Sequence, residues 1–295
     1  MAEVLQQLVN AVSLGAVYAL MALGLALVYS VLGLINFAHG ELMTIAAYTL
    51  VFSSAAHVPL AIGLALAIGA SVVAAVLMER IVFRPVRGSG PMTLLLTSVA
   101  ISIMIQTAFQ MLISPLPRGA DLPDFLYQAF DLGPVRLGVL PLISATTAIA
   151  GSWIVVKALR ATNIGISIRA SAENFTITRL LGVPAQRVVI WTFVLSGAVA
   201  GLAGVIWMAQ RGSVDPLMGS TPLLKAFVAT VLGGLGSVPG AILGGFALGA
   251  AEIVLQAFLP PELLPFRDAI VFALVIAVLT VRPRGLLPAK LGERV

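Results

Sequence analysis

Long apolar stretches without a single charged residue are the feature that most constrains what this chain can fold into. Val4–Val31, Pro59–Met78 and Val188–Ala209 are three of them. Each is long enough to cross the hydrocarbon core of a bilayer, which takes about 20 residues as a helix. Across all 295 residues, 60% are hydrophobic and 10% are charged, whereas about a quarter of the residues in a soluble domain are charged. The pattern predicts an all-α fold, a polytopic bundle of transmembrane helices.

The basic residues gather in three intervals between the apolar stretches. These intervals hold 12 of the 17 Lys and Arg residues but only three acids, Glu79, Glu173 and Glu293. Their basic residues are Arg80, Arg84 and Arg87; Lys157, Arg160, Arg169, Arg179 and Arg187; and Arg282, Arg284, Lys290 and Arg294. By the positive-inside rule, we expect all three intervals on the cytoplasmic side. The net charge of +5 is then explained by membrane topology and contact with anionic lipids, and it indicates no nucleic-acid partner.

Eight full crossings and a ninth, broken one place the basic intervals on one side, with the N-terminus outside and a single domain over residues 1–295. The full crossings are predicted at Val4–Val31, Asn36–His57, Pro59–Met78, Met92–Ile113, Leu137–Val156, Val188–Ala209, from Gly240 to Leu259, and at Arg267–Val281. The Pro-rich interval 115–136, with Asp121, Asp124 and Asp131, suits a short extracytoplasmic loop. The N-terminal MAEVLQQL has no Lys or Arg, so we expect that it is not a secretory signal and is retained.

The stretch Lys225–Leu259 must turn back on itself, because a single crossing there would leave the last basic interval outside. The sequence GGLGSVPG, residues 233–240, supplies the break, since Gly and Pro stop a helix. The arm before it, Ala226–Leu232, is too short to span a bilayer. We therefore expect a half-helix or re-entrant segment, whose irregular backbone is buried in protein or reached by water.

The longest polar interval between two crossings is Ile166–Arg187. Asn163 or Ser167 can cap one helix running to Leu181, with Gly182 as the stop and Pro184 preventing continuation. These residues predict a short surface helix, within the cytoplasmic loop 157–187, that offers Arg169, Glu173 and Arg179 to a partner. The alternative is a solvated loop that lies on anionic headgroups without a docking role.

No ATP site, metal centre or covalent chemistry is visible in the sequence. A phosphate-binding GxxxxGK[ST] loop is excluded because the dipeptide Gly-Lys does not occur. The chain has no Cys, and its two histidines, His39 and His57, lie eighteen residues apart without an HExxH motif. We therefore expect no enzymatic activity, no metal and no cofactor.

Few charged residues fall inside the predicted crossings, and each has two interpretations. Glu41 lies about one turn into a helix that Asn36 can cap, where the helix dipole favours a carboxylate. The alternative places Asn36, His39 and Glu41 on a translocation path at a broken helix start. Glu252 lies twelve residues beyond Gly240, which favours an ion pair with Lys225; a proton relay is the alternative.

Small residues recur at GxxxG spacing near the second interruption. The sets are Gly236, Gly240 and Gly244; Gly245 and Gly249; and Gly197 and Gly201. This spacing lets helices approach closely. The glycines are interpreted either as contacts between helices of one subunit, or as part of a subunit interface or of the lining of a solute path. Interrupted segments at 33–40 and 233–240 fit the discontinuous helices of transporters. The candidate path residues are accordingly Asn36, His39, Glu41, Gly233, Gly234, Gly236 and Gly240.

Four motifs resemble one known family over essentially the whole chain. They are GLINFAHGE at 33–41, IRASAEN at 168–174 followed by LLG at 180–182, VLGGLGSVPGAILGG at 231–245, and RPRGLL at 282–287. In this order they resemble the bacterial branched-chain amino acid ABC transporter permeases, and specifically the H-type subunit of the Liv system. The resemblance implies a multi-pass inner-membrane subunit of an importer. It also implies a second permease subunit, two cytoplasmic ATPase subunits that bind the ATP, and a periplasmic solute-binding protein.

In that family the polar loop is similar to the coupling helix that contacts the ATPases. Ala172 and Glu173 match the start of its EAA pattern and Gly182 matches its later glycine, while Asn174 and Phe175 depart from the small residues expected there. The coupling residues that the resemblance implies are Arg169, Ala172, Glu173, Asn174, Arg179 and Gly182.

Three alternatives remain open at this point. The solute is a branched-chain or other neutral amino acid, but relatives of similar sequence move urea or short amides. An ion-coupled secondary carrier working alone is a rival class. A membrane-embedded enzyme would need a nucleophile, base and metal set, and none is visible.

Overall fold

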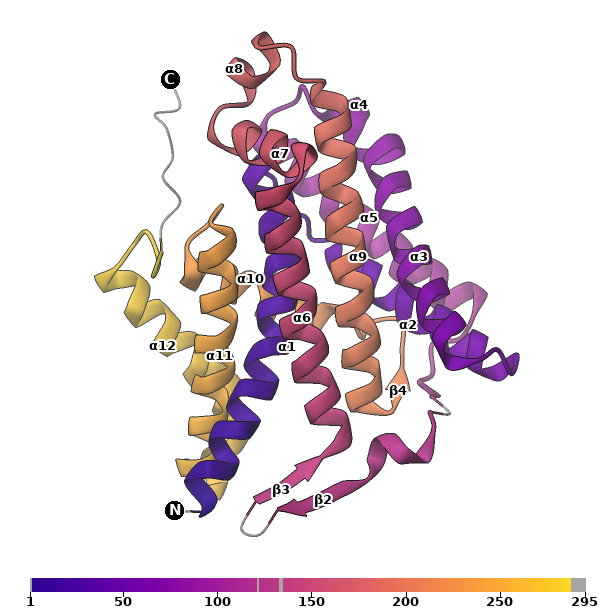
Figure 1. The fold of residues 1–295 in the computed structure, drawn as a ribbon, viewed down its shortest axis with the longest axis vertical. Coiled ribbons are helices and arrows are strands. Elements are labelled where there is room, and N and C mark those ends of the chain that lie inside the picture. Colours follow the sequence, from indigo (N-terminus) through magenta and orange to yellow (C-terminus); the bar gives the residue numbers. More distant parts are fainter. Residues whose placement is uncertain (1, 121, 133–134, 288–295) are drawn as a thin grey trace.

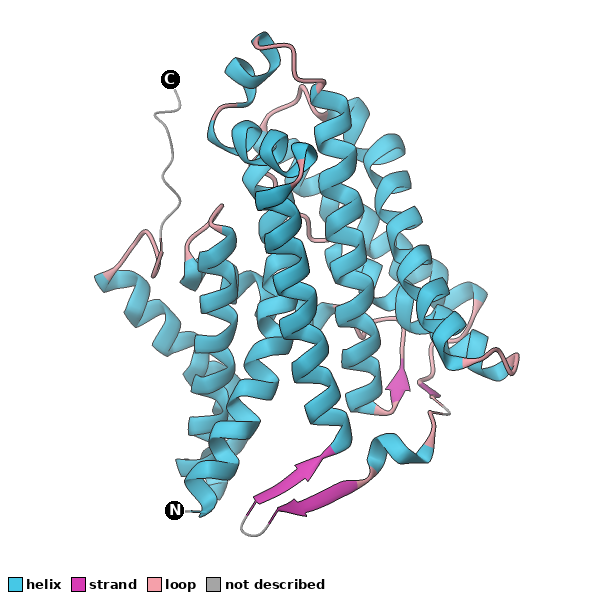
Figure 2. Ribbon diagram, in the orientation of Figure 1, coloured by secondary structure: helices cyan, strands magenta, loops and turns pink. Residues whose placement is uncertain are grey.

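The computed structural model describes residues 2–120, 122–132 and 135–287. The chain is a bundle of helices with two short pairs of strands toward one end (Figure 1, Figure 2). Its long helices are α1 (Ala2–Leu32), α3 (Leu60–Leu77), α5 (Pro91–Leu112), α6 (Val139–Ala161), α9 (Ala185–Arg211), α11 (Val238–Phe258) and α12 (Arg267–Val281). The shorter ones are α2 (His39–Ala55), α4 (Arg84–Val86), α7 (Asn163–Glu173), α8 (Phe175–Leu180) and α10 (Ser220–Gly233), with a π-helical turn η1 (Met78–Phe83) and the 3₁₀ turns η2 (Asp124–Tyr127) and η3 (Pro261–Phe266).

Seven of the described helical segments are long and apolar enough to cross a membrane, where α3 is counted together with η1 and α4, and the 15-residue α12 together with η3. This confirms the prediction of an all-α, polytopic bundle. Two predicted segments are shorter. Helix α2 has 17 residues because it runs from His39 to Ala55 rather than from Asn36 to His57, and α10 has 14.

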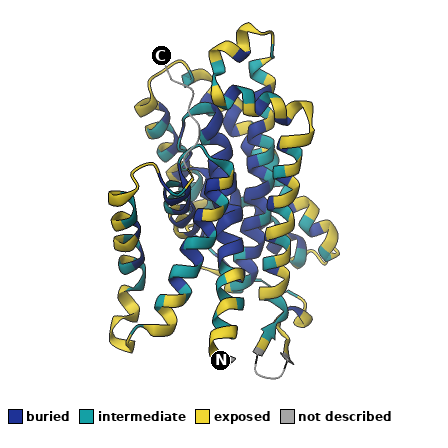
Figure 3. Ribbon diagram, turned by 60° about the vertical axis from the view of Figure 1, so that its left-hand side comes forward, coloured by how far each residue is buried: buried dark blue, intermediate teal, exposed yellow. Residues whose placement is uncertain are grey.

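Helix α1 forms the centre of the bundle, and the dark blue of buried residues follows it in Figure 3. In the most apolar 18-residue stretch of α1, 83% of the residues are buried, whereas in that of α5 only 17% are. Helix α11 packs directly on α1, because Gly15 meets Gly249 and Gly245 meets the backbone of Ala19. A side chain at any of these glycines would overlap the facing helix.

The other glycine pairs also pack within the chain. Gly197 and Gly201 of α9 face α3 at Ser71, and Gly244 faces the backbone of α10 at Ala229. Among the alternatives weighed for the GxxxG spacing, the structure therefore places these glycines in contacts between helices of one subunit.

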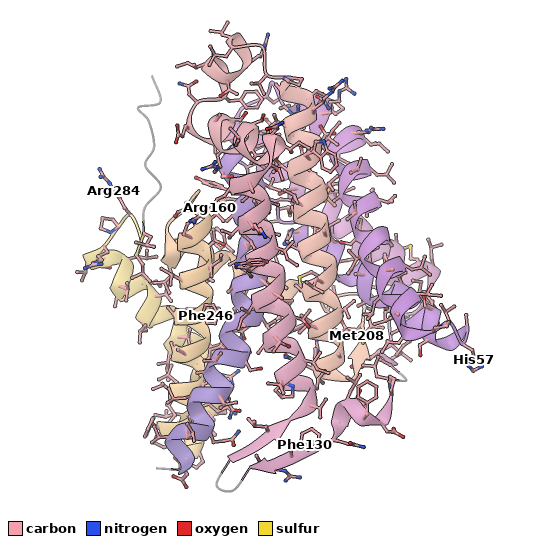
Figure 4. The ribbon with its side chains drawn as sticks, viewed as in Figure 1. His57, Phe130, Arg160, Met208, Phe246 and Arg284 are labelled. Atoms are coloured by element: carbon pink, nitrogen blue, oxygen red, sulfur yellow. The ribbon has the colours of Figure 1, made fainter. Side chains whose placement is uncertain are left out.

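The basic intervals lie at one end of the bundle. Helices α4, α7 and α8 share the end shown at the top of Figure 1, and Arg160 and Arg284, labelled in Figure 4, lie toward it. Lys290 and Arg294 fall outside the described residues. The predicted extracytoplasmic interval 115–136 lies at the opposite end, near the start of α1 (Figure 1).

Two strand pairs shape that opposite end. Strand β2 (Ala129–Leu132) pairs antiparallel with β3 (Val135–Gly138), so that Ala129 faces Gly138. Strand β1 (Arg118–Gly119) pairs antiparallel with β4 (Ser213–Val214), which ties the interval to the segment after α9. Asp121 falls outside the described residues.

The predicted half-helix before the break at 233–240 is confirmed as α10, but it starts earlier than predicted. The loop after β4 enters the bundle, since Pro216, Met218 and Gly219 are buried, and Gly219 meets Gly40 at the start of α2. Helix α10 starts there and runs from Ser220 rather than from Ala226. Residues 233–240 form a tight turn between α10 and α11, because Gly234 and Gly236 adopt positive φ angles. The sequence pattern pointed to the turn because its glycines are conspicuous, whereas the entering loop carries one proline.

Candidate functional site

The predicted docking loop folds into two helices rather than one. Thr162 caps α7 by accepting a hydrogen bond from the Gly165 backbone N–H (3.0 Å), and Asn174 caps α8 by accepting one from Ile177 (2.9 Å). The single helix capped by Asn163 or Ser167 is therefore wrong. The chain breaks at Asn174 because its side chain competes with the helix for backbone N–H groups. We call residues 163–182, which comprise α7, Asn174, α8 and the turn at Leu181 and Gly182, the elbow.

The elbow presents most of the predicted coupling residues at its surface. Glu173 and Arg179 are exposed, while the Arg169 Nε donates to the Leu159 carbonyl of α6 (3.0 Å) and anchors α7. Gly182 ends α8 with φ +85° and faces open space, which confirms its predicted role as the stop.

The outer tip of the elbow is apolar. Leu180 is 81% exposed and Leu181 79% exposed, at the end that carries the basic intervals. Exposed leucines side by side on a short helix mark a surface that a partner or a membrane covers.

A cavity of about 700 Å³ lies beneath the elbow. Its walls come from the end of α1, from Arg87 and from residues 171–177, including Ala172, Glu173 and Asn174. Arg87 also forms an ion pair with the buried Glu79 and donates to Gln186 Oε1 at the start of α9 (3.2 Å). Arg87, which lines the cavity, is thus tied to both η1 and α9.

A second group of polar residues lies where α2 begins. Asn36 is buried, and its Oδ1 accepts from the Ala38 N–H (3.0 Å), which ends the irregular segment after α1. His39 packs against Gly24 of α1, and its Nδ1 lies 3.3 Å from Ser196 Oγ of α9. His57, the other histidine, lies far away at the edge of the molecule (Figure 4).

Glu41 faces α5 from the first turn of α2. Its Oε1 accepts hydrogen bonds from Ser102 Oγ (2.9 Å) and Gln106 Nε2 (2.7 Å). Gln106 also reaches Ser220 Oγ (3.3 Å), the first residue of α10. The Glu41 side chain is fully buried, and its Oε2 has no hydrogen-bond partner among the described residues.

Lys225 forms the ion pair with Glu252 that the sequence predicts, with 2.8 Å between Nζ and Oε1. Tyr18 joins them: Lys225 Nζ lies 3.0 Å from the Tyr18 hydroxyl, which donates to Glu252 Oε2 at 2.9 Å. Asp268 of α12 lies 3.6 Å from Nζ. One charge on α10 therefore links α1, α11 and α12.

The structure does not bring together the two halves of the predicted path. Gly233, Gly234, Gly236 and Gly240 lie in the turn at the far end of α10, away from Asn36, His39 and Glu41. There the N–H groups of Leu286 and Leu287 donate to the carbonyls of Leu232 and Gly233, both at 2.9 Å. The motifs at 231–245 and 282–287 thus meet each other.

The polar face of α5 is what sequence reasoning missed. Ser98, Ser102 and Gln106 recur every four residues in an apolar helix and all face the start of α2. That four-residue spacing is visible in the sequence, and it could have identified these three residues as one face of the helix. The arrangement gathers hydrogen-bonding side chains of α2, α5 and α10, and within the described residues no three His, Asp or Glu side chains gather to hold a metal.

Comparisons with known proteins point in one direction. The family model described as branched-chain amino acid transport system / permease component matches residues 7–279. The chain is 35% identical over 308 residues to the high-affinity branched-chain amino acid transport system permease protein LivH of Salmonella typhimurium, covering 99% of this chain and 97% of that protein. It is 32% identical over 305 residues to BraD, the corresponding permease protein of Pseudomonas aeruginosa, covering 99% and 98%.

A more distant similarity covers half of the chain. It is 34% identical over 148 residues to the autoinducer 2 import system permease protein LsrC of Klebsiella pneumoniae, covering 48% of this chain and 41% of that protein. No solved structure matches the chain.

Proposed function

The chain belongs to the permease components of branched-chain amino acid transport systems, and from this premise we propose how it works: the elbow receives mechanical work from ATPase subunits, and α2, α5 and α10 border the solute path. The protein is a multi-pass membrane subunit of an ATP-binding-cassette transporter, and it catalyses no reaction itself. Such a permease component acts together with ATPases and a binding protein.

The finer composition that we propose is one second permease of a different type, two cytoplasmic ATPases and one periplasmic solute-binding protein, assembled in a bacterial inner membrane. The observation that carries the proposal is the elbow. It projects at the basic end of the bundle, carries Glu173 and Arg179 at its surface, and ends in the exposed pair Leu180 and Leu181. An apolar tip with charged neighbours fits into a pocket of a soluble partner better than it fits against a layer of lipid headgroups.

Within the elbow, Arg169 and Gly182 fix the geometry while Glu173 and Arg179 meet the partner. Ala172 and Asn174 line the cavity beneath, so movement of the elbow changes the space against α1. The Glu79–Arg87–Gln186 contacts then pass the displacement to α3 and α9.

The solute path that we propose runs past the start of α2, where Asn36, His39 and Glu41 lie, between α5 and α10. The turn with Gly233, Gly234, Gly236 and Gly240 fixes the inner end of α10 rather than contacting solute. Because irregular backbone at membrane depth persists only where protein or water covers it, the segments 33–38 and 215–219 suit a path lining.

The solute is a branched-chain or other neutral amino acid. The names of the full-length relatives state branched-chain amino acids, whereas the name of the half-length relative states autoinducer 2 import, so the solute varies among the relatives. No described residue favours urea or a short amide. The comparisons favour ATP-driven transport over an ion-coupled carrier, because the matching relatives are named as permeases of transport systems.

Charge reversal at the elbow tests the coupling role. We expect Glu173→Lys to abolish uptake of labelled leucine by the reconstituted complex, while the protein stays folded and inserted, because the side chain is exposed. Glu262→Lys reverses another exposed acid, in the η3 turn between α11 and α12, and should transport normally. Normal uptake by Glu173→Lys would remove Glu173 from the coupling surface.

A further inference from the structure

Glu41 differs from the other two buried carboxylates of the bundle. Glu79 pairs with Arg87 and Glu252 pairs with Lys225, but no described basic residue lies within ion-pair distance of Glu41. Its Oε1 accepts two hydrogen bonds, whereas Oε2 is buried without a partner among the described residues. A buried carboxylate without a counter-charge is costly, so its retention calls for a compensating group.

One side chain contacts both this carboxylate and an exposed residue at the start of α10. Gln106 Nε2 lies 2.7 Å from Glu41 Oε1 and 3.3 Å from both Ser102 Oγ and Ser220 Oγ. Gln106 itself is half-buried and Ser220 is exposed. Polar side chains in membrane helices face protein or water rather than lipid. Gln106 therefore connects the buried Glu41 with the exposed Ser220.

The start of helix α10, where the positive end of a helix dipole lies, is close to the Glu41 carboxylate. Helix α10 begins at Ser220, has 14 residues and carries no side-chain cap, so the positive end of its dipole lies at Ser220. The Gln106 side chain donates to both Glu41 Oε1 and Ser220 Oγ, and so connects the carboxylate with the start of α10. Phe37 and Phe227, with ring centroids 6.1 Å apart, supply half-buried apolar surface near the same helix starts.

We propose that Glu41 receives the ammonium group of a zwitterionic amino acid, with Gln106 as its removable cover and the start of α10 facing the solute carboxylate. This inference rests on the proposed function and deepens it, because it names the chemical group that the path recognises. The apolar rings accommodate a neutral side chain. A divalent cation fits poorly, because it takes six or more oxygen ligands, usually from several carboxylates, and no group of three acidic or His side chains occurs among the described residues.

The first test removes the charge and keeps the shape. In proteoliposomes holding the complete transporter with its binding protein, Glu41→Gln should lower leucine uptake by about tenfold or more, because a charge-assisted hydrogen bond is lost. ATP turnover stimulated by the loaded binding protein should persist, since the elbow is untouched. Glu41→Asp keeps the charge and should transport better than Glu41→Gln. Ser152→Ala, which removes a buried hydroxyl on α6 away from the site, should leave uptake unchanged.

A second pair of variants does not depend on how Glu41→Gln folds. Gln106→Lys places a tethered ammonium group against Glu41 and should block uptake by about tenfold or more, while Gln106→Met, of similar size and uncharged, should lower it less. Equal uptake by these two variants would overturn the site, and so would normal uptake by Glu41→Gln.

The controls separate this proposal from the proposed function. Normal leucine uptake by the wild-type complex together with normal uptake by Glu41→Gln would reject the ammonium site and leave the transport function standing. A wild-type complex that moves no neutral amino acid would reject both. Uptake that stops when an uncoupler collapses the proton gradient would make Glu41 part of an ion-coupled path instead, and would also overturn the proposal.

Discussion

Lys225 is a positive charge in a short helix surrounded by apolar neighbours, and its partners explain how it is tolerated there. Glu252 neutralises it at 2.8 Å, and the Tyr18 hydroxyl contacts both side chains. A buried pair of this kind adds little net stability, but the loss of one partner leaves the other charge buried and alone. Its value is therefore in fixing where α10 lies against α1 and α11.

Removal of the Lys225 charge should be far more damaging than removal of the whole pair. We expect Lys225→Met to lower the free energy of unfolding by about 3–5 kcal/mol, because Glu252 keeps a buried charge. The double variant Lys225→Met with Glu252→Gln should recover most of that loss, and Tyr18 keeps an acceptor in it. Denaturant titration in detergent micelles measures both; equal losses in the single and double variants would show that the charges do not act as a pair.

At the scale of elements, glycine contacts decide how closely the helices pack. Gly245 of α11 faces the Ala19 backbone of α1, so any side chain there pushes the two central helices apart. We expect Gly245→Val to abolish the single symmetric peak in fluorescence-detected size-exclusion chromatography. Gly69→Val is the matched control, because nothing lies within 4 Å of Gly69 on α3, and it should elute as the wild type does. Identical profiles would mean that the α1–α11 contact tolerates expansion.

The sequence predicted the helices better than it predicted their interruptions. Uncharged stretches such as Pro59–Met78 identify crossings because the bilayer leaves little alternative to a helix. The break at Asn174 was missed, because a capping side chain inside a helical pattern is identified only when its hydrogen bond is seen. The entry of residues 215–219 into the bundle was missed for a related reason: it depends on the Gly40–Gly219 contact between distant segments.

In the candidate site too, some residues could be identified from the sequence and others only from the folded chain. Asn36, His39 and Glu41 could be singled out because polar residues at a helix start within an apolar chain are unusual. Their partners Ser102, Gln106 and Ser196 come from α5 and α9, and only the folded chain brings them together. The pairing of Lys225 with Glu252 was predictable, since helix length places them at similar depth.

At the scale of the whole molecule, the two ends of the bundle differ in charge and shape. The elbow and the basic intervals occupy one end, and the hairpin of β2 and β3 occupies the other (Figure 1). A transporter driven from one side needs this asymmetry, because ATPases and a binding protein approach opposite faces. Everything proposed for coupling and solute entry depends on the elbow facing the cytoplasm.

Sided labelling of single cysteines measures that orientation, and the chain has no native Cys to interfere. Leu181 on the elbow is 79% exposed in the structure, and Phe130 on β2 is 59% exposed, so a Cys at either position can be labelled. In intact cells, a membrane-impermeant maleimide should label Phe130→Cys and should label Leu181→Cys only after the inner membrane is opened. Labelling of Leu181→Cys in intact cells, with Phe130→Cys protected, would contradict the account.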